Sequence, residues 1–329
     1  MEKERVCVTG GTGYVASWLV MRLLQLGYSV HATVRSHSHP GKKKDISYLK
    51  SLPGATDQLK IFNADLNEPD SFNAAIEGCS GIFHVAHPMD EDGKEPEEPV
   101  TKLAVQGLLS ILKSCLNSKT VNRVIYTSTA ATILYNDKGL SVADESTWSD
   151  IDICRRNQNK YISTSYLVSK TVTEKTALDF AEEHGLDLVT IVLPLVVGPF
   201  ICPKIPSSVN MALAMAFGNH DRYGAITNLY MVHIEDAVQA HIFLLEYPNT
   251  KGRYICSSAN VSITTIFEYL SAKYPEFGIP NMMWFKENED HDTCSLSSMK
   301  LLDSGFKFKF TVEDMFDGAI QCCKNKGFL

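Results

Sequence analysis

Tyr166 and Lys170 are the side chains whose types and spacing most clearly suggest chemistry. They stand four residues apart in segment 163–184, which predicts a helix, so both fall on one helix face. An ammonium group close to a phenol stabilises the phenolate. We therefore expect Lys170 to lower the pKa of Tyr166 from its ordinary value of about 10. A phenol tuned in this way can donate a proton to a carbonyl oxygen.

The Y-x-x-x-K spacing is weak evidence by itself, because it occurs again at Tyr247 and at Tyr269. A proline directly after Tyr247 prevents a continuous helix there, and Tyr269 lies late in the chain. Tyr166 instead follows a predicted strand whose end carries hydroxyl side chains at 127–129. The alternative is an ordinary tyrosine on an amphipathic helix. Its position favours a catalytic role, with a hydroxyl from the strand end binding the substrate oxygen.

Segment 5–35 predicts a dinucleotide site. A β-branched run ends at Gly10, a glycine turn and an amphipathic helix follow, and a second apolar run ends at Arg35. Gly10 suits a sharp turn, Gly13 lets the main chain approach a pyrophosphate, and Ala16 allows close helix–strand packing. The unpaired amides of the first helical turn attract the same anion.

A glycine turn without a ligand is the alternative, but the flanking strands and helix favour the nucleotide. Arg35 favours NADP(H), because an arginine at this strand end suits a 2′-phosphate where an acidic residue would bind ribose hydroxyls. It does not exclude NAD(H), which is the less favoured cofactor. Lys42–Lys44 add positive charge nearby or form a solvated loop. The turn is expected to contact the cofactor through Gly10, Thr12, Gly13, Tyr14 and Val15.

The bulk properties limit the class of protein. The 329 residues suit a nucleotide-binding domain with a smaller partner, and 44% hydrophobic with 21% charged residues is ordinary for a globular protein. A net charge of −7 argues against a nucleic-acid surface. No apolar run reaches the roughly 20 residues of a membrane span, and the N-terminus leads straight into a strand. Nine scattered cysteines are expected as free thiols, so we expect a cytoplasmic protein.

Predicted strands and helices alternate through the first two thirds of the chain. This order predicts an α/β fold, a Rossmann-type doubly wound parallel sheet covered on both faces. Residues 136–160 are expected as a loop. Beyond the first unit, strands are predicted at 59–63, 81–85, 123–127 and 186–193, and helices at 45–51, 70–77, 100–117 and 163–184.

The regular alternation fades after residue 193. We expect 1–193 to form the cofactor-binding domain and 194–329 a smaller substrate-binding region, with 230–250 returning to the first domain. Ligands of such sheets bind outside the carboxyl ends of the strands, so the second half should form the pocket. Further elements are expected at 208–217, 252–256, 263–273 and 312–324.

Over essentially its whole length the chain resembles the extended short-chain dehydrogenases/reductases, within the plant dihydroflavonol 4-reductase and vestitone reductase branch. The matching segments include VTGGTGYVASWLVMRLLQLGYSVHATVR, RVIYTST, SYLVSKTVTEK and LPLVVGPF. The resemblance implies the Rossmann fold, NADP(H), a small-molecule substrate and a monomer.

The resemblance also implies roles for individual residues. Tyr166 would be the general acid, Lys170 would bind the nicotinamide ribose, and Arg35 with Lys43 or Lys44 would hold the 2′-phosphate. The remaining implied cofactor contacts are Asp65, Leu66, Val85, Ala86, His87, Pro194, Val196, Val197 and Ser208.

Two positions depart from the pattern of the branch. Thr129 stands where the branch has its catalytic serine; threonine keeps the hydroxyl but restricts χ1, and Ser128 is the weaker substitute. Leu134 stands where dihydroflavonol reductases place an asparagine that binds B-ring hydroxyls, which disfavours a catechol-bearing substrate. The substrate pocket is expected to include His87, Met89, Leu134 and Tyr161.

A metal site is not expected. His84, His87, His233 and His241 are not joined by cysteines or carboxylates at ligand spacing.

These observations predict an NADPH-dependent reductase of a carbonyl in a plant specialised metabolite, either an isoflavonoid or flavonoid, or an alkaloid. One alternative is the reverse reaction, NAD(P)+-dependent oxidation of an alkaloid alcohol or lactol, because GGTGYVASWL also resembles noscapine synthase. Another is a nucleotide-binding member that transfers no hydride, such as a cyclase or sensor, for which Thr129 is the only support.

Overall fold

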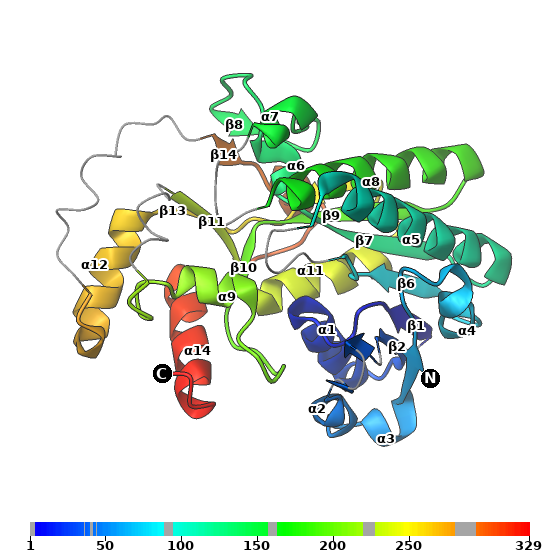
Figure 1. Ribbon diagram of the computed structural model, residues 1–329, viewed down its shortest axis with the longest axis horizontal. Coiled ribbons are helices and arrows are strands. Elements are labelled where there is room, and N and C mark those ends of the chain that lie inside the picture. The colour runs from blue at the N-terminus through cyan, green and yellow to red at the C-terminus, as the bar shows by residue number, and fades with distance from the viewer. Residues whose placement is uncertain are drawn as a thin grey trace.

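The protein consists of a large layered lobe on a parallel sheet and a smaller lobe beside it, seen here in a computed structural model (Figure 1). Three predicted site residues, Lys44, Met89 and Tyr161, lie outside the described residues, and only the backbone of Lys43 is described. The structure describes residues 4–35, 37–39, 42–43, 45–88, 95–156, 163–219, 228–279 and 294–329.

The large lobe is built on a seven-stranded sheet in the order β12-β9-β7-β6-β1-β2-β5, and every strand pairing in it is parallel. The chain runs outward from β1 to β5 and then returns to β6 on the other side of β1, which leaves a crevice at this reversal. The α/β doubly wound prediction is confirmed. The strands are β1 (Arg5–Val8), β2 (Ser29–Val34), β5 (Leu59–Asn63), β6 (Gly81–His84), β7 (Arg123–Thr129), β9 (Leu188–Leu193) and β12 (Gly252–Ile255).

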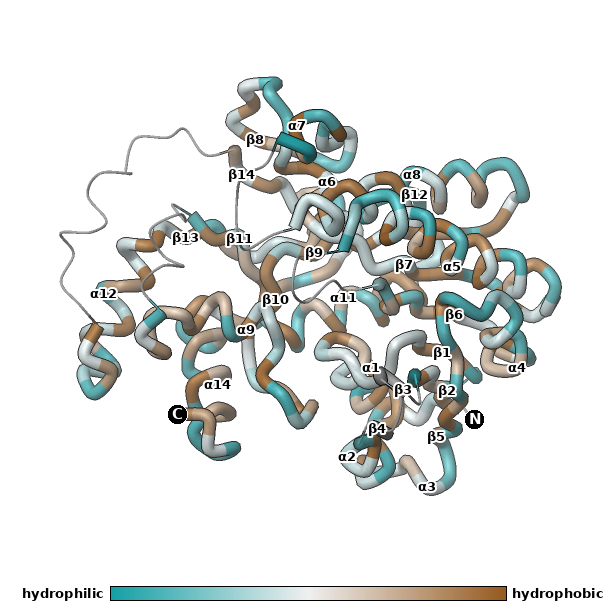
Figure 2. The backbone as a smooth tube through the Cα atoms, in the orientation of Figure 1, coloured by the Kyte–Doolittle hydropathy of each residue, from teal (hydrophilic) through white to brown (hydrophobic). Residues whose placement is uncertain are grey.

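Helices cover both faces of this sheet, which explains why its strands are nearly continuous apolar runs. One face packs against α1 (Tyr14–Gln25) and α11 (Ile234–Glu246). The other packs against α4 (Asn73–Ile76), α5 (Glu97–Ser118) and α8 (Thr164–His184). The outer helices alternate hydrophobic and hydrophilic residues along their length, as expected for helices with one buried face (Figure 2).

Local signals define α8, the helix that carries Tyr166. The Ser163 side chain accepts a hydrogen bond from the Tyr166 amide at 3.2 Å, which begins the helix at residue 164. Gly185 ends it in the left-handed conformation, with φ of 66°. The first turn of α8 is therefore fixed by its own sequence.

The smaller lobe contains a three-stranded sheet in the order β10-β11-β13, whose core also includes α9, α12 and α14. The predicted boundary at residue 193 between a cofactor-binding and a substrate-binding domain stays a prediction. The edge strand of the large sheet, β12, comes from the part of the chain after this boundary. Within 230–250, α11 packs on the large sheet, but β11 pairs with β10 and β13. The bounds are β10 (Leu195–Val197), β11 (Asn228–His233), β13 (Ala259–Ser262), α9 (Ser207–Ala212), α12 (Ile263–Lys273) and α14 (Val312–Asn325).

The segment 136–160, expected as a loop, contains the strand β8 (Val142–Ala143) and the helix α7 (Ile151–Arg155). β8 pairs with β14 (Ser295–Leu296) far along the chain, so no local pattern signals it. Asp150 caps α7, and this cap is visible in the sequence. The other elements are β3 (His37–His39), β4 (Lys42–Lys43), α2 (Ser47–Lys50), α3 (Ala55–Gln58), η1 (Pro69–Phe72), α6 (Ala131–Leu134), η2 (Pro275–Phe277) and α13 (Met299–Asp303).

Candidate active site

The glycine turn after β1 has the form of an anion cradle. Gly10 has φ of +70°, and a Cβ atom there would approach the Ala86 Cα to 3.1 Å. Gly13 is exposed at the start of α1, where no side chain caps the helix amides and the first turn holds no acidic residue. The residues present thus fit a pyrophosphate at the end of α1.

The side chain of Tyr14 is engaged within the protein, and its predicted contact with the cofactor stays a prediction. Its hydroxyl donates to the Gly198 carbonyl at 3.0 Å, and its ring lies edge-on to Phe200. Burial raises the pKa of the Tyr14 phenol well above its ordinary value, so the phenol stays protonated as the donor. This side chain joins α1 to the segment that follows β10.

The predicted contacts for the adenosine half follow the carboxyl ends of β2 and β5. Arg35 directly follows β2 and is exposed. The Asp65 carboxylate accepts hydrogen bonds from the Asn67 amide and from Asn67 Nδ2, both at 3.0 Å, so it closes a local turn. Leu66 packs over Gly107 of α5, where a Cβ atom would come within 2.7 Å of it.

Thr9, which sequence reasoning missed, orders the loop after β6. Its hydroxyl oxygen accepts from the Val85 amide at 3.1 Å and from the Ala86 amide at 3.0 Å. The same hydroxyl lies 2.9 Å from His84 Nδ1. The available signal was a hydroxyl residue at the end of β1, directly before the glycine turn.

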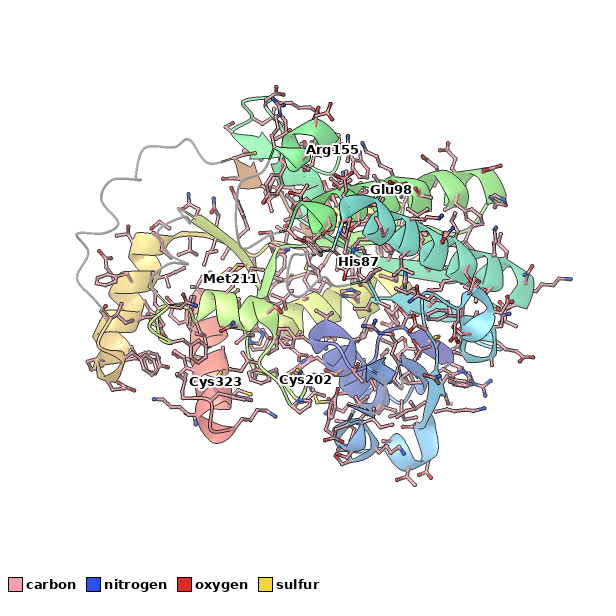
Figure 3. All side chains as sticks on the ribbon, viewed as in Figure 1. His87, Glu98, Arg155, Cys202, Met211 and Cys323 are labelled. Atoms are coloured by element: carbon pink, nitrogen blue, oxygen red, sulfur yellow. The ribbon has the colours of Figure 1, made fainter. Side chains whose placement is uncertain are left out.

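Tyr166, Thr129 and His87 come together beyond the carboxyl end of β7. The Thr129 side chain hydrogen-bonds Tyr166, and the His87 ring stands edge-on to the Tyr166 ring with centroids 5.8 Å apart. His87 Nε2 lies 3.2 Å from the Ser169 hydroxyl on the same helix as Tyr166. His87 lies near the centre of the molecule, between the α5–α8 layer and the α1–α11 layer (Figure 3).

Lys170 lies one helical turn from Tyr166, but the pKa of Tyr166 is not lowered as the sequence suggested. Its ammonium donates to the Thr127 carbonyl at 3.0 Å, and burial lowers the pKa of Lys170 to about 8. Burial raises the pKa of Tyr166, and the hydrogen bond with Thr129 opposes this only in part. The expected lowering of the Tyr166 pKa was wrong, because desolvation by burial outweighs the hydrogen bond with Thr129.

Ser128 has a partner that removes it from the substrate side. Its hydroxyl donates to Glu174 Oε2 at 2.6 Å, and the side chain is buried. Successive side chains of a strand point to opposite faces, so Ser128 and Thr129 cannot serve the same site. The structure therefore corrects the expectation that Ser128 could substitute for Thr129 as the catalytic hydroxyl.

The cofactor contacts that the resemblance implies for the segment after β9 stay a prediction. Val196 and Val197 have their side chains in the hydrophobic cores of the two lobes, which leaves only their main chain for a cofactor. Pro194 and Ser208 are half-buried, and Leu134 is half-buried at the end of α6. These three remain available to line the crevice.

The histidines have partners other than metals. His241 hydrogen-bonds Thr127 at 2.9 Å, and His233 stacks on Phe310 with ring centroids 4.1 Å apart. Burial lowers the pKa of His84 to about 3, so it is neutral. Among the described residues, no three metal-binding side chains are grouped to hold an ion. No helix in the same part of the chain combines the length and apolar character needed to cross a bilayer.

The chain is similar over its whole length to plant proteins of known name, reductases among them. Vestitone reductase of Medicago sativa is 51% identical over 327 residues, which cover 99% of both chains. Protein BRI1-5 ENHANCED 1 of Arabidopsis thaliana is 54% identical over 331 residues, covering 100% of this chain and 90% of the relative. A dihydroflavonol 4-reductase of Zea mays is 47% identical over 329 residues, covering 100% of this chain and 90% of the relative.

The solved structure of alfalfa vestitone reductase superposes with a TM-score of 0.88 at 49% identity, covering 99% of this chain and 100% of that one. Residues 6–256 match the NAD dependent epimerase/dehydratase family. The chain therefore belongs to the NAD dependent epimerase/dehydratase family, among the extended short-chain dehydrogenases/reductases, and is an NAD(P)-dependent oxidoreductase.

Proposed function

We propose that this protein reduces a ring ketone of the isoflavonoid or flavonoid class with NADPH. The observation that carries the proposal is the hydrogen bond between the Thr129 side chain and Tyr166. Thr129 is the last residue of β7, so it lies at the same edge of the parallel sheet as the glycine turn that follows β1. Two hydroxyls that meet in this way can both bind one carbonyl oxygen. The 51% identity to vestitone reductase supports a substrate of this class.

Each residue of the site has a separate role in the proposed reduction. Because burial raises its pKa, Tyr166 keeps its proton near neutral pH and can donate it to the carbonyl oxygen as negative charge develops there. Thr129 holds the same oxygen in place. When bound, a reduced nicotinamide supplies the hydride. Lys170 carries a positive charge below pH about 8, and this charge favours the anionic character of Tyr166 as the proton leaves.

NADPH is the proposed cofactor because of Arg35. Its exposed guanidinium follows β2, the position at which a fold of this type meets the 2′ substituent of the adenosine ribose. A planar guanidinium binds a phosphate through paired hydrogen bonds. The glycine turn with Gly10 and Gly13 would hold the pyrophosphate.

Leu134 supports a substrate without a catechol ring. It is half-buried at the end of α6, five residues after Thr129, and offers no polar atom in its side chain. A buried hydroxyl placed against it would lose its hydrogen bonds to water without replacement.

The test is a stoichiometric assay of the full chain. NADPH or NADH is mixed with a 2′-hydroxyisoflavanone, a flavanone or a catechol-bearing dihydroflavonol, and the reverse reaction is tried with NADP+ and an alkaloid lactol. We expect one NADPH consumed per alcohol formed, fastest with the isoflavanone. Turnover only in the oxidative direction would contradict the proposal, as would product formed without any change in the cofactor.

A further inference from the structure

Glu174 and Arg253 form a buried ion pair beneath the candidate active site. Arg253 Nε lies 3.0 Å from Glu174 Oε1, with side-chain exposures of 5% and 0%. Removing two charges from water is costly, so such a pair must be compensated by further hydrogen bonds. Ser128 and Thr190 supply them to the carboxylate, donating at 2.6 Å and 2.7 Å.

The guanidinium of Arg253 is equally engaged. Its Nη1 donates to the Glu145 carbonyl at 2.9 Å and to the Thr147 carbonyl at 2.7 Å. Its Nη2 donates to the Thr132 hydroxyl at 2.9 Å and lies 3.4 Å from Glu174 Oε2. One arginine on β12 thus binds both the segment after β8 and the helix α6.

Packing and a second hydrogen bond hold the same segment. The guanidinium carbon of Arg253 lies 3.7 Å from the centroid of the Trp148 ring. The Glu145 side chain in turn accepts from the Ile255 amide of β12 at 2.9 Å. Residues 145–148 are therefore attached to the edge of the large sheet.

This network reaches the reacting groups through two short paths. Thr132 passes it on, because its hydroxyl donates to the Thr129 carbonyl at 2.9 Å while it accepts from Arg253. Ser128, the neighbour of Thr129, is held directly by Glu174. Glu174 belongs to α8, one turn beyond Lys170, so the carboxylate is fixed to the helix that carries Tyr166.

We propose that the Arg253–Glu174 pair is a positioning device that sets the spacing between α8, which presents Tyr166, and segment 128–148, which presents Thr129 and Leu134. Two apolar side chains could fill this volume, but they could not bind two main-chain carbonyls and a relay hydroxyl together. As a claim about catalysis, this inference rests on the proposed function.

Arg253→Lys is the decisive variant, because it keeps the charge opposite Glu174 and removes the forked donors. We expect kcat/KM for reduction of the ketone substrate to fall by about 10- to 100-fold, because a small misplacement of a reacting group strongly lowers the rate. The Kd for NADPH should not change. Hydrogen exchange, followed by mass spectrometry, should become faster at the amides of 128–149.

Arg123→Lys is the matched control. Arg123 also pairs with a carboxylate, Asp187 at 2.8 Å, and donates to main-chain carbonyls, including that of Tyr247 at 2.6 Å, but at the opposite end of β7. Its replacement should lower the thermal midpoint and leave both kcat/KM and the exchange of 128–149 unchanged. An equal loss of kcat/KM in both variants would overturn the positioning role.

Thr132→Val and Thr132→Ser keep the test decisive if Arg253→Lys does not fold. Valine removes only the relay hydroxyl, and we expect it to lower kcat/KM and loosen 128–149, whereas serine should restore both. If valine leaves both quantities unchanged, the positioning role is wrong. If the wild-type protein reduces no ketone, the proposed function fails, while the exchange data still decide whether the pair orders this segment.

Discussion

The Lys170 ammonium donates a hydrogen bond to the Thr127 main-chain carbonyl at 3.0 Å, one residue before the strand presents Ser128 and two before Thr129. This bond fixes the lysine to the same strand end that carries Thr129, the proposed catalytic hydroxyl. It also places a charge in a buried position, with the phenol of Tyr166 one helical turn away.

The activity should fall as pH rises through the pKa of Lys170. Burial lowers that pKa to about 8, whereas the pKa of Tyr166 is raised, so the lysine loses its proton first. The ammonium is the form that supports proton donation, and kcat/KM should therefore be constant below pH about 8 and decline above it. The pH profile of kcat/KM measures this directly.

Folding stability should depend on pH in the opposite sense. An unfolded lysine has a pKa of about 10.4, so between about 8 and 10.4 the unfolded chain binds more protons than the folded one. The free energy of unfolding should gain a contribution from Lys170 as pH rises through this window. Lys170→Met should lack that contribution, and identical pH dependence of wild type and variant would contradict the assignment.

Thr129 and Ser128 should separate activity from stability. Thr129→Ala removes a hydroxyl from the substrate oxygen and should lower kcat by roughly 100-fold, while Thr129→Ser should retain most of it. Ser128→Ala should lower kcat far less than Thr129→Ala, because it loosens only the position of the strand end, and it should lower the free energy of unfolding by about 1–3 kcal/mol, because a buried carboxylate loses a donor. Steady-state kinetics and urea unfolding measure the two effects. A larger kcat loss in Ser128→Ala than in Thr129→Ala would reverse the assignment.

Replacing Gly10 by alanine tests the predicted cofactor cradle, and the same replacement at Gly27 is the control. Both have positive φ, 70° and 84°, but only a Cβ at Gly10 would meet neighbouring atoms, those of Ala86. Replacement of either by alanine should lower the free energy of unfolding by about 1–2 kcal/mol. Only Gly10→Ala should also raise the Kd for NADPH, as titrated by fluorescence; an unchanged Kd would place the cradle elsewhere.

Arg35 should distinguish the two nicotinamide cofactors. Arg35→Ser removes the cation at the end of β2, and the Kd for NADPH should rise by roughly 10- to 100-fold, the value of a charge-assisted hydrogen bond. NADH lacks the 2′-phosphate and serves as the internal control, with an unchanged Kd. A parallel loss for both cofactors would mean that Arg35 does not recognise the phosphate.

The sequence predicted those parts of the candidate site whose geometry depends on residues close together in the chain. The turn from Gly10 to Gly13 and the helical pair Tyr166–Lys170 follow from sequence periodicity, because their geometry is set within a few residues. The pKa of Tyr166 could not be predicted in this way, since desolvation depends on elements that pack around it in the folded chain.

Long-range contacts account for most of what sequence reasoning missed. Arg253 and Glu174 are 79 residues apart in the chain, and no local sequence pattern around either residue predicts the pair. Val196 and Val197 matched the implied cofactor segment, but each strand residue also has to fill a core, and their side chains are buried there. Ser128, by contrast, could have been excluded from sequence alone by the two-residue period of β7.

Tyr166→Phe tests the central claim most directly. The variant keeps the ring that lies against His87 and loses only the hydroxyl, so the full chain should bind NADPH with an unchanged Kd. The rate of ketone reduction, followed by the loss of reduced-nicotinamide absorbance, should fall by about 100- to 10,000-fold. Reduction near the wild-type rate by this variant would show that Tyr166 is not the proton donor and would contradict the account.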